Sequence, residues 1–287
     1  MKTIVTHLNP DLDAMAAIWL IRRFLPGWSK TRVEFVPAGE TFEGKPVDDD
    51  LEIIHCDTGG GKFDHHQTDK DICAATLIWK EILKENPRLA ARQGKLDDWH
   101  KKAVGRMLAV INEVDHAKFL AWPKPTSDLW DFSFYQALGG VVGCFKDEPT
   151  KIIDSSLTFL DGIFKIFCEK IEAEGILEYG IKFKTEWGKG IAAKTDNAEF
   201  RYLALKSGFS VAVRQRPKTG HLGIYGNWQK GVNLRKVYEK LLKLDPKATW
   251  FFHASGCLVL NGSVHNPKMK ATKLEIEEVI KLFKNYK

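Results

Sequence analysis

Two polar stretches of this sequence carry residue types that bind divalent metal ions. The first, residues 7–13, holds one histidine and two aspartates; the second, residues 57–66, runs from an aspartate through three glycines to Asp64-His65-His66. Carboxylates and imidazoles suit Mn²⁺, Mg²⁺, Fe²⁺, Co²⁺ or Zn²⁺. Two such ions that share a carboxylate can activate water and stabilise a reacting phosphoryl group. The two stretches therefore predict a metal-dependent phosphoryl-transfer site.

The elements around these stretches predict how they would meet. Residues 3–6 and 51–56 are apolar or β-branched runs that predict buried strands, and each ends directly before one of the polar stretches. Residues 31–38 predict a third strand, and residues 14–25 a helix. Ligands bind beyond the carboxyl ends of strands in open α/β sheets, and carboxylates are favoured at helix N-termini. We therefore expect both stretches to share one site at that edge of the sheet.

In their order along the chain, these residues resemble the motifs of the DHH phosphoesterases, a family named for the tripeptide found here at residues 64–66. The motifs are matched in turn by His7, Asp11 and Asp13; by Asp57; by Asp64-His65-His66; and by Asp115, after an expected helix at residues 97–114. The first and third motifs together would occur by chance in under roughly 0.1% of shuffled chains. Asp64-His65-His66-Gln67 and His253-Ala254-Ser255-Gly256 are most similar to the branch that includes the eukaryotic melanocyte-proliferating-gene protein.

This resemblance implies two divalent metal ions, with Mn²⁺ as the first choice, and a hydroxide between them that attacks phosphorus. It implies one ion held by His7, Asp11, Asp57 and Asp115, and the other by Asp13, Asp57, His65 and Asp115. His66 cannot easily reach the same ion as its neighbour, so we assign it to the phosphoryl oxygens or the leaving group. Asp64 would orient an imidazole. Asn9 would either bond the attacking water or phosphate, or form the turn before Pro10.

The remaining elements predict an α/β protein in which a doubly wound, mostly parallel sheet precedes a smaller α+β domain across a cleft. Residues 72–85 and 151–174 show helical spacing, whereas the aromatic segment 120–149 reads as irregular. The predicted organisation is a catalytic domain at residues 1–150, a connecting helix at 151–180 and a substrate-binding domain at 181–287.

The last domain is expected to be a small α+β module. Its predicted strands lie at residues 181–183, 190–193, 202–205, 210–213 and 222–225, and its helices at 234–244 and 273–283. The resemblance implies that this domain binds the phosphate or nucleotide of the substrate. Candidates for that role are His253, Ser255, Gly256, Arg214 and Arg216, although the arginines could equally belong to a solvated strand face.

Composition narrows the class of protein. The chain has 287 residues, 44% of them hydrophobic, and a formal charge of +6 that suits a polyanionic partner. Its apolar runs are too short to cross a bilayer, so we expect a cytoplasmic protein without a membrane partner. Its five cysteines are an odd number without CxxC spacing, which argues against a disulfide framework or a thiolate zinc site.

The leading hypothesis is an enzyme that hydrolyses phosphodiester bonds in RNA or short oligonucleotides, as an exonuclease. One alternative is a small-molecule phosphohydrolase that acts on a nucleoside bisphosphate or pyrophosphate. Another is a nucleic-acid-binding protein without catalytic turnover. The choice between RNA and DNA, the polarity of degradation and the oligomeric state stay open, with a homodimer as one option.

Overall fold

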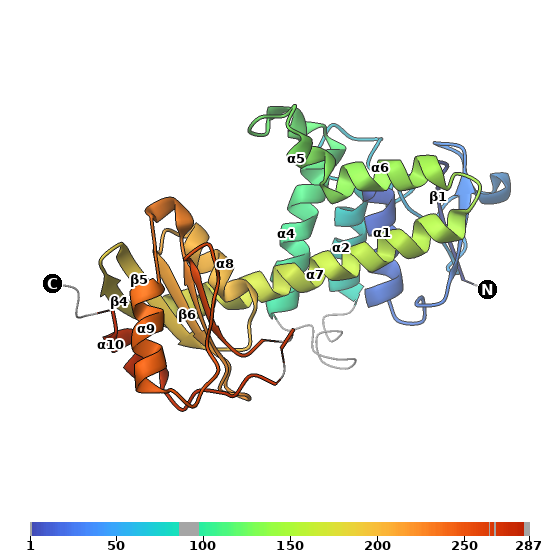
Figure 1. Ribbon diagram of the computed structural model, residues 1–287. Coiled ribbons are helices and arrows are strands. Elements are labelled where there is room, and N and C mark those ends of the chain that lie inside the picture. The colour runs from blue at the N-terminus through green and yellow to red at the C-terminus, as the bar shows by residue number, and fades with distance from the viewer. Residues whose placement is uncertain (1, 86–97, 264, 267, 284–287) are drawn as a thin grey trace. The chain divides into compact units, whose positions relative to one another are not determined.

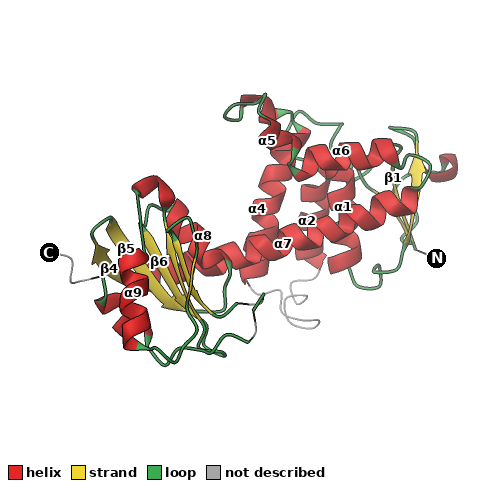
Figure 2. Cartoon of the chain, in the orientation of Figure 1, coloured by secondary structure: helices red, strands yellow, loops and turns green. Residues whose placement is uncertain are grey.

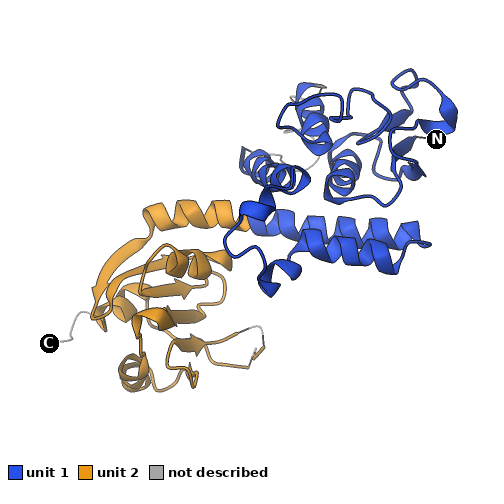
Figure 3. Cartoon of the chain, turned by 90° about the horizontal axis from the view of Figure 1, so that it is seen from above, with its two compact units in different colours: residues 1–167 blue, residues 168–287 orange. Residues whose placement is uncertain are grey.

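The computed structural model describes residues 2–85, 98–263, 265–266 and 268–283. The chain forms two compact units, residues 1–167 and 168–287, which are blue and orange in Figure 3. The division falls inside the long helix α7 (Pro149–Tyr179). Each unit has a sheet of its own (Figure 1).

A three-stranded parallel sheet forms one part of the first unit. Its order is β2-β1-β3, and its strands are β1 (Thr3–His7), β2 (Arg32–Val36) and β3 (Ile53–His55). β1 is the central strand because its Thr3-Ile4-Val5-Thr6 run is buried. The three strands expected from the sequence are present, and their carboxyl ends lie at the same edge of the sheet.

Helices make up most of the rest of the first unit (Figure 2). The longer ones are α1 (Leu12–Phe24), α2 (Ala74–Glu85), α4 (Asp98–Asp115) and the first part of α7. α1 is buried on nearly every face and contacts both α2 and α4. Residue 97, the expected start of α4, lies outside the described residues.

The aromatic segment expected to be irregular is in large part helical. It contains η2 (Lys118–Ala121), α5 (Asp128–Asp131) and α6 (Phe134–Cys144), and a further short turn of helix, η1 (Phe42–Gly44), follows β2. The three glycines of α6 have a low helix propensity, so this helix was not predicted from the sequence. Propensity is a weak guide where a helix packs against other elements, and Leu138 of α6 is buried.

The second unit is built on a six-stranded mixed sheet. Its order is β4-β5-β6-β7-β9-β8, and the β5–β6 pair is parallel whereas the other pairs are antiparallel. The strands are β4 (Ile181–Thr185), β5 (Gly188–Lys194), β6 (Val211–Gln215), β7 (Leu222–Gly226), β8 (Phe251–Phe252) and β9 (Leu258–Asn261). With a parallel first sheet and a mixed second sheet, the expected α/β class is confirmed.

The helices of the second unit are α8 (Glu199–Lys206), η3 (Trp228–Lys230), α9 (Arg235–Leu244) and α10 (Ile276–Lys281). The strand predicted at residues 202–205 is wrong, because these residues belong to α8. Its buried residues, Phe200 and Ala204, are four positions apart and lie on one helical face. Among all described helices, none is both long and apolar enough to cross a membrane.

Candidate metal centre

The carboxyl ends of β1 and β3 deliver the first two side chains of the site. His7 is the last residue of β1, and Asp57 follows β3 in the left-handed region, with φ of 58°. That conformation is uncommon for a residue other than glycine and is typical of functional sites. His7 Nε2 lies 3.2 Å from Asp57 Oδ2, and His7 Nδ1 lies 2.9 Å from the Leu8 carbonyl oxygen. Because a carbonyl only accepts, Nδ1 carries a proton and Nε2 faces the site.

The N-terminus of α1 contributes two carboxylates with different surroundings. Asp11 is the N-cap and accepts a hydrogen bond of 3.0 Å from the Ala14 amide. Asp13 lies in the first turn, is 1% exposed and accepts hydrogen bonds from the amides of Ala74 (2.7 Å) and Ala75 (2.8 Å) at the start of α2. Asp13 therefore also joins the N-termini of two helices.

The glycine loop after β3 turns the chain so that residues 64–66 return to the site. Gly59 and Gly60 have φ of 82° and 69°, which favour glycine. A Cβ on Gly61 would lie only 2.6 Å from Val47 Cγ2, so the loop packs tightly against the preceding turn. Asp48 of that turn accepts a hydrogen bond of 2.7 Å from the Lys62 amide. This loop therefore has a fixed path.

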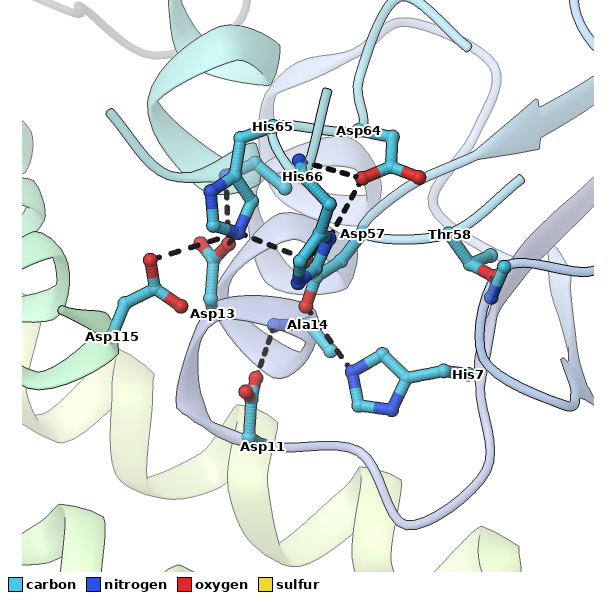
Figure 4. Close-up of polar contacts among 12 residues, drawn as sticks. His7, Asp11, Asp13, Ala14, Asp57, Thr58, Asp64, His65, His66 and Asp115 are labelled. Carbon is cyan, nitrogen blue, oxygen red and sulfur yellow. Dashed lines mark hydrogen bonds and ion pairs between the residues drawn. The ribbon is translucent and has the colours of Figure 1, made fainter. Parts of the chain in front are cut away.

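His65 occupies the centre of the cluster. Its Nε2 lies 3.3 Å from Asp57 Oδ1, 3.6 Å from Asp115 Oδ2 and 3.8 Å from Asp13 Oδ2. Figure 4 shows these side chains pointing toward one another from α1, the segment after β3 and the end of α4. His65 Nε2, Asp57 Oδ1 and Asp115 Oδ2 are buried and have no hydrogen-bond partner among the described residues. Buried polar atoms in such a state fit a bound cation.

His66 is held differently from its neighbour. Its side chain is 64% exposed, and its Nδ1 lies 2.8 Å from Asp64 Oδ1. Asp64 also accepts hydrogen bonds from the amides of His66 (3.0 Å) and Gly60 (2.8 Å). His66 Nδ1 is 3.7 Å from Asp57 Oδ1, but its bond with Asp64 engages that nitrogen. Nε2 is thus the ring nitrogen of His66 that the bond with Asp64 leaves unengaged.

Asp115, the last residue of α4, is accompanied by a histidine that the sequence did not single out for a role. His116 Nδ1 lies 3.1 Å from Asp115 Oδ2 and 3.0 Å from the Asn112 carbonyl oxygen. Together, His65, Asp115 and His116 have ligand atoms within 4.8 Å of one another. A histidine directly after the motif aspartate was the sequence signal for this contact.

The electrostatics of the cluster favour cation binding. Burial raises the pKa of Asp13 well above its usual range, and the nearby Asp57 carboxylate adds to the effect. Burial also raises the pKa of Asp115. The hydrogen bond with Asp57 raises the pKa of His7 to about 9. Without a cation the carboxylates repel one another, and the histidine retains a proton to compensate.

The residues present fit a pair of divalent ions. His7, Asp11 and Asp57 have ligand atoms within 4.8 Å of one another, as do Asp57, His65 and His66, so that Asp57 belongs to both groups. Oxygen and imidazole ligands are those that Mg²⁺, Mn²⁺, Fe²⁺, Co²⁺ and Zn²⁺ accept. Cys56, next to Asp57, is fully buried, and burial raises the pKa of its thiol well above the usual value. The thiol therefore stays protonated and is a poor ligand.

A cavity of about 290 Å³ opens beside the cluster within the first unit. Its lining includes Asp11, Asp13 and Asp115 together with Tyr135 and Leu138 of α6. Asn9, in a left-handed turn with φ of 54°, also lines this cavity. The expected substrate contact of Asn9 therefore lies beside the carboxylates.

The other predicted substrate-binding residues belong to the second unit. His253 and Ser255 are exposed, and His253 Nδ1 accepts a hydrogen bond of 3.1 Å from the Ser255 amide. Gly256 is buried, with φ of 77°, and forms the turn after them. Arg214 is only 6% exposed and donates a hydrogen bond of 3.0 Å to the Asn197 carbonyl oxygen, which is a structural role inside the unit. Arg216 is half-buried at the end of β6.

No family model matches this chain, and no curated protein matches it. Among solved structures, RecJ from Thermus thermophilus in complex with Mg²⁺ aligns with 93% of this chain at 10% identity and a TM-score of 0.31. This chain covers 48% of that RecJ chain. An exopolyphosphatase-related protein from Bacteroides fragilis aligns with 98% of this chain and 90% of its own length, at 13% identity and a TM-score of 0.26.

Proposed function

We propose that this protein is a metal-dependent phosphoesterase of the DHH type that hydrolyses phosphodiester bonds in RNA or short oligonucleotides, as an exonuclease with two metal ions. One observation carries the proposal. Six motif residues come together from four segments, namely His7, Asp11, Asp13, Asp57, His65 and Asp115. Three of their atoms are buried without a hydrogen-bond partner among the described residues.

We assign the ligand sets from these contacts and leave His66 out, although its ligand atom lies within 4.8 Å of those of Asp57 and His65, because Asp64 engages its Nδ1. His7 and Asp11 would hold one ion, His65, Asp13 and Asp115 the other, and Asp57 would serve both. When bound, two divalent ions lower the pKa of water and stabilise charge on the attacking and leaving oxygens of a phosphoryl group. The bond from His7 Nδ1 to the Leu8 carbonyl fixes the tautomer that presents Nε2 as a ligand.

His66 is suited to proton transfer at the substrate. Burial alone would lower the pKa of His66, but the hydrogen bond with Asp64 and the nearby aspartates outweigh it and raise the pKa. The hydrogen bond with Asp64 favours the imidazolium, whose Nε2–H can donate a proton to the leaving oxygen. Burial would raise the pKa of Asp64, but three hydrogen bonds lower it, so Asp64 stays ionised and orients the ring.

The second unit would bind the rest of a polyanionic substrate. Because His253 Nδ1 accepts the Ser255 amide hydrogen, the neutral ring carries its proton on the exposed Nε2. That N–H can donate to a phosphate oxygen, whereas the Ser255 hydroxyl donates to His253 Nδ1 at 2.9 Å and helps to hold the ring in place. The overall charge of +6 favours the approach of such a substrate.

The test is a cleavage assay with Mn²⁺ or Mg²⁺ on end-labelled short RNA, the matching DNA and pyrophosphate. We expect mononucleotides from the oligomer, and Asp57→Asn should lower kcat/KM about a thousandfold or more. Asp69→Asn, an exposed aspartate beyond the motif, is the matched control and should retain activity. Phosphate from pyrophosphate, without cleavage of either oligomer, would identify a small-molecule phosphohydrolase instead. Tight oligonucleotide binding with no turnover on any substrate would refute an enzymatic role.

A further inference from the structure

A second cavity in the first unit has a different chemical character from the metal site. It has a volume of about 240 Å³ and lies between α4, α6, α7 and the segment that precedes α6. Its lining is almost entirely apolar and includes the aromatic rings of Trp122, Trp130, Phe134, Tyr135 and Phe167. Pockets for drug-sized ligands have roughly 300–1,000 Å³, so this volume suits a single ring system.

The cavity is continuous with the wall of the metal site. Leu12, Val114 and Tyr135 line both this cavity and the one beside the carboxylates. Leu12 is the neighbour of Asp11 and Asp13, and Val114 precedes Asp115 in the chain. The two cavities are therefore neighbours, as are a nucleobase and the phosphate of its own nucleotide.

The indole N–H groups of the cavity wall are engaged by acceptors of the protein itself. Trp122 Nε1 donates to Glu113 Oε2 at 2.9 Å, and Trp130 Nε1 donates to the carbonyl oxygens of Pro123 and Lys124, each at 3.1 Å. Ser133 supplies a hydroxyl in the lining, and its Oγ is buried with no partner in the described part of the chain. Aromatic faces stack on any base, whereas edge donors and acceptors are needed to tell bases apart.

We propose that this aromatic cavity is a base-binding subsite that stacks the nucleobase next to the scissile phosphate without discriminating among bases. The inference rests on the proposed phosphodiesterase function. It predicts that a base is required for efficient cleavage, and that adenine, guanine, cytosine and uracil are accepted about equally.

The experiment compares kcat/KM for four 5′-phosphorylated homodinucleotides with that for an analogue in which hydrogen replaces both bases. We expect kcat/KM to be about tenfold or more higher for the base-bearing substrates than for the base-free one. Among the four base-bearing substrates, kcat/KM should differ by under about threefold. Two variants should bring the ratio of kcat/KM between base-bearing and base-free substrates close to one. Ser133→Leu fills the cavity, and Trp130→Ala removes one of its walls. Phe132→Ala removes an aromatic ring that is 93% exposed and outside the lining, and it should leave the ratio unchanged.

The failure of the subsite and the failure of the function give different results. Equal cleavage of base-bearing and base-free substrates would overturn the subsite and leave the phosphodiesterase intact. A strong preference for one base would overturn stacking without discrimination. If no substrate is cleaved, calorimetry with the Mn²⁺-loaded protein tests the subsite. The subsite is supported if adenosine 5′-monophosphate binds about tenfold more tightly than ribose 5-phosphate and Ser133→Leu abolishes this difference. Equal binding of the two compounds overturns it.

Discussion

Metal binding should release a proton from His7, and this release can be measured. In the metal-free protein the hydrogen bond with Asp57 raises the pKa of His7 to about 9. At pH 7.5 about 97% of such a group is protonated, whereas an imidazole must be neutral to bind a metal ion. Binding of the ion that His7 holds should therefore displace close to one proton at this pH, and almost none above pH 10.

The magnitude follows from the gap between the pH and the pKa. Deprotonating a group of pKa about 9 at pH 7.5 costs about 2 kcal/mol, since each pH unit corresponds to 1.36 kcal/mol. The apparent affinity for this ion should thus rise about tenfold per pH unit from pH 7 toward 9 and then level off. Calorimetric titration with Mn²⁺ in two buffers of different ionisation enthalpy gives both the affinity and the number of protons released.

Two variants isolate the contribution of His7. His7→Asn should release about one proton fewer than the wild type and should lose most of the increase in affinity above pH 7. His265→Asn changes an exposed histidine of the second unit and should match the wild type. Equal proton release by the wild type and His7→Asn between pH 7 and 9 would refute the reasoning, because His7 would then be either neutral in the metal-free protein or not a ligand.

Three further predictions concern other groups of the site. His66→Ala should lower kcat by about 100-fold while calorimetry finds unchanged Mn²⁺ stoichiometry, since His66 is assigned to the substrate; loss of an ion would make it a ligand instead. Asp13→Ala leaves the amides of Ala74 and Ala75 without their acceptor. The free energy of unfolding of the metal-free protein, measured in urea, should therefore fall by about 2–4 kcal/mol. An unchanged urea midpoint would contradict this role of Asp13. The raised pKa of His7 stabilises the metal-free protein below pH 6.5, and this stabilisation is lost as the pH rises through about 9. A shift from pKa 6.5 to about 9 corresponds to a stabilisation of at most about 3.4 kcal/mol, which solvent screening of this partly exposed group reduces to about 1–2 kcal/mol. The Tm of the wild type should therefore fall between pH 7 and 9, whereas the Tm of His7→Asn should not.

Much of the site could be predicted because its residues lie in short local motifs. His7 is the last residue of a strand, and Asp11 is the cap of the helix that follows, so their spacing reflects a single strand–turn–helix connection. The tripeptide at residues 64–66 follows a glycine loop in the same way. Parallel pairing then brings the two strand ends to one edge of the sheet, which is a general rule of α/β proteins.

The hydrogen bonds that hold the motif residues in place from distant segments could not be predicted. The bond from the Lys62 amide to Asp48 joins residues 14 positions apart, and Asp13 accepts from Ala74, 61 positions away. Side-chain burial in the second unit was equally hidden: Arg214 looked like a surface residue on a strand but donates to a backbone carbonyl inside the unit. Sequence periodicity says which face of an element is apolar and leaves open what packs against it.

Asp13 explains why this site combines structural and chemical demands. A buried carboxylate near Asp57 and Asp115 costs free energy, which is why its pKa is raised, yet its two hydrogen bonds join α1 to α2. Replacing Asp13 by an apolar residue would remove the charge but leave two amides unpaired. A divalent ion resolves the conflict because it compensates the carboxylates while the amides keep their acceptor. An ion that binds the folded protein stabilises it by RT ln(1 + [L]/Kd), so the first unit should gain stability from the same ions that its proposed chemistry requires.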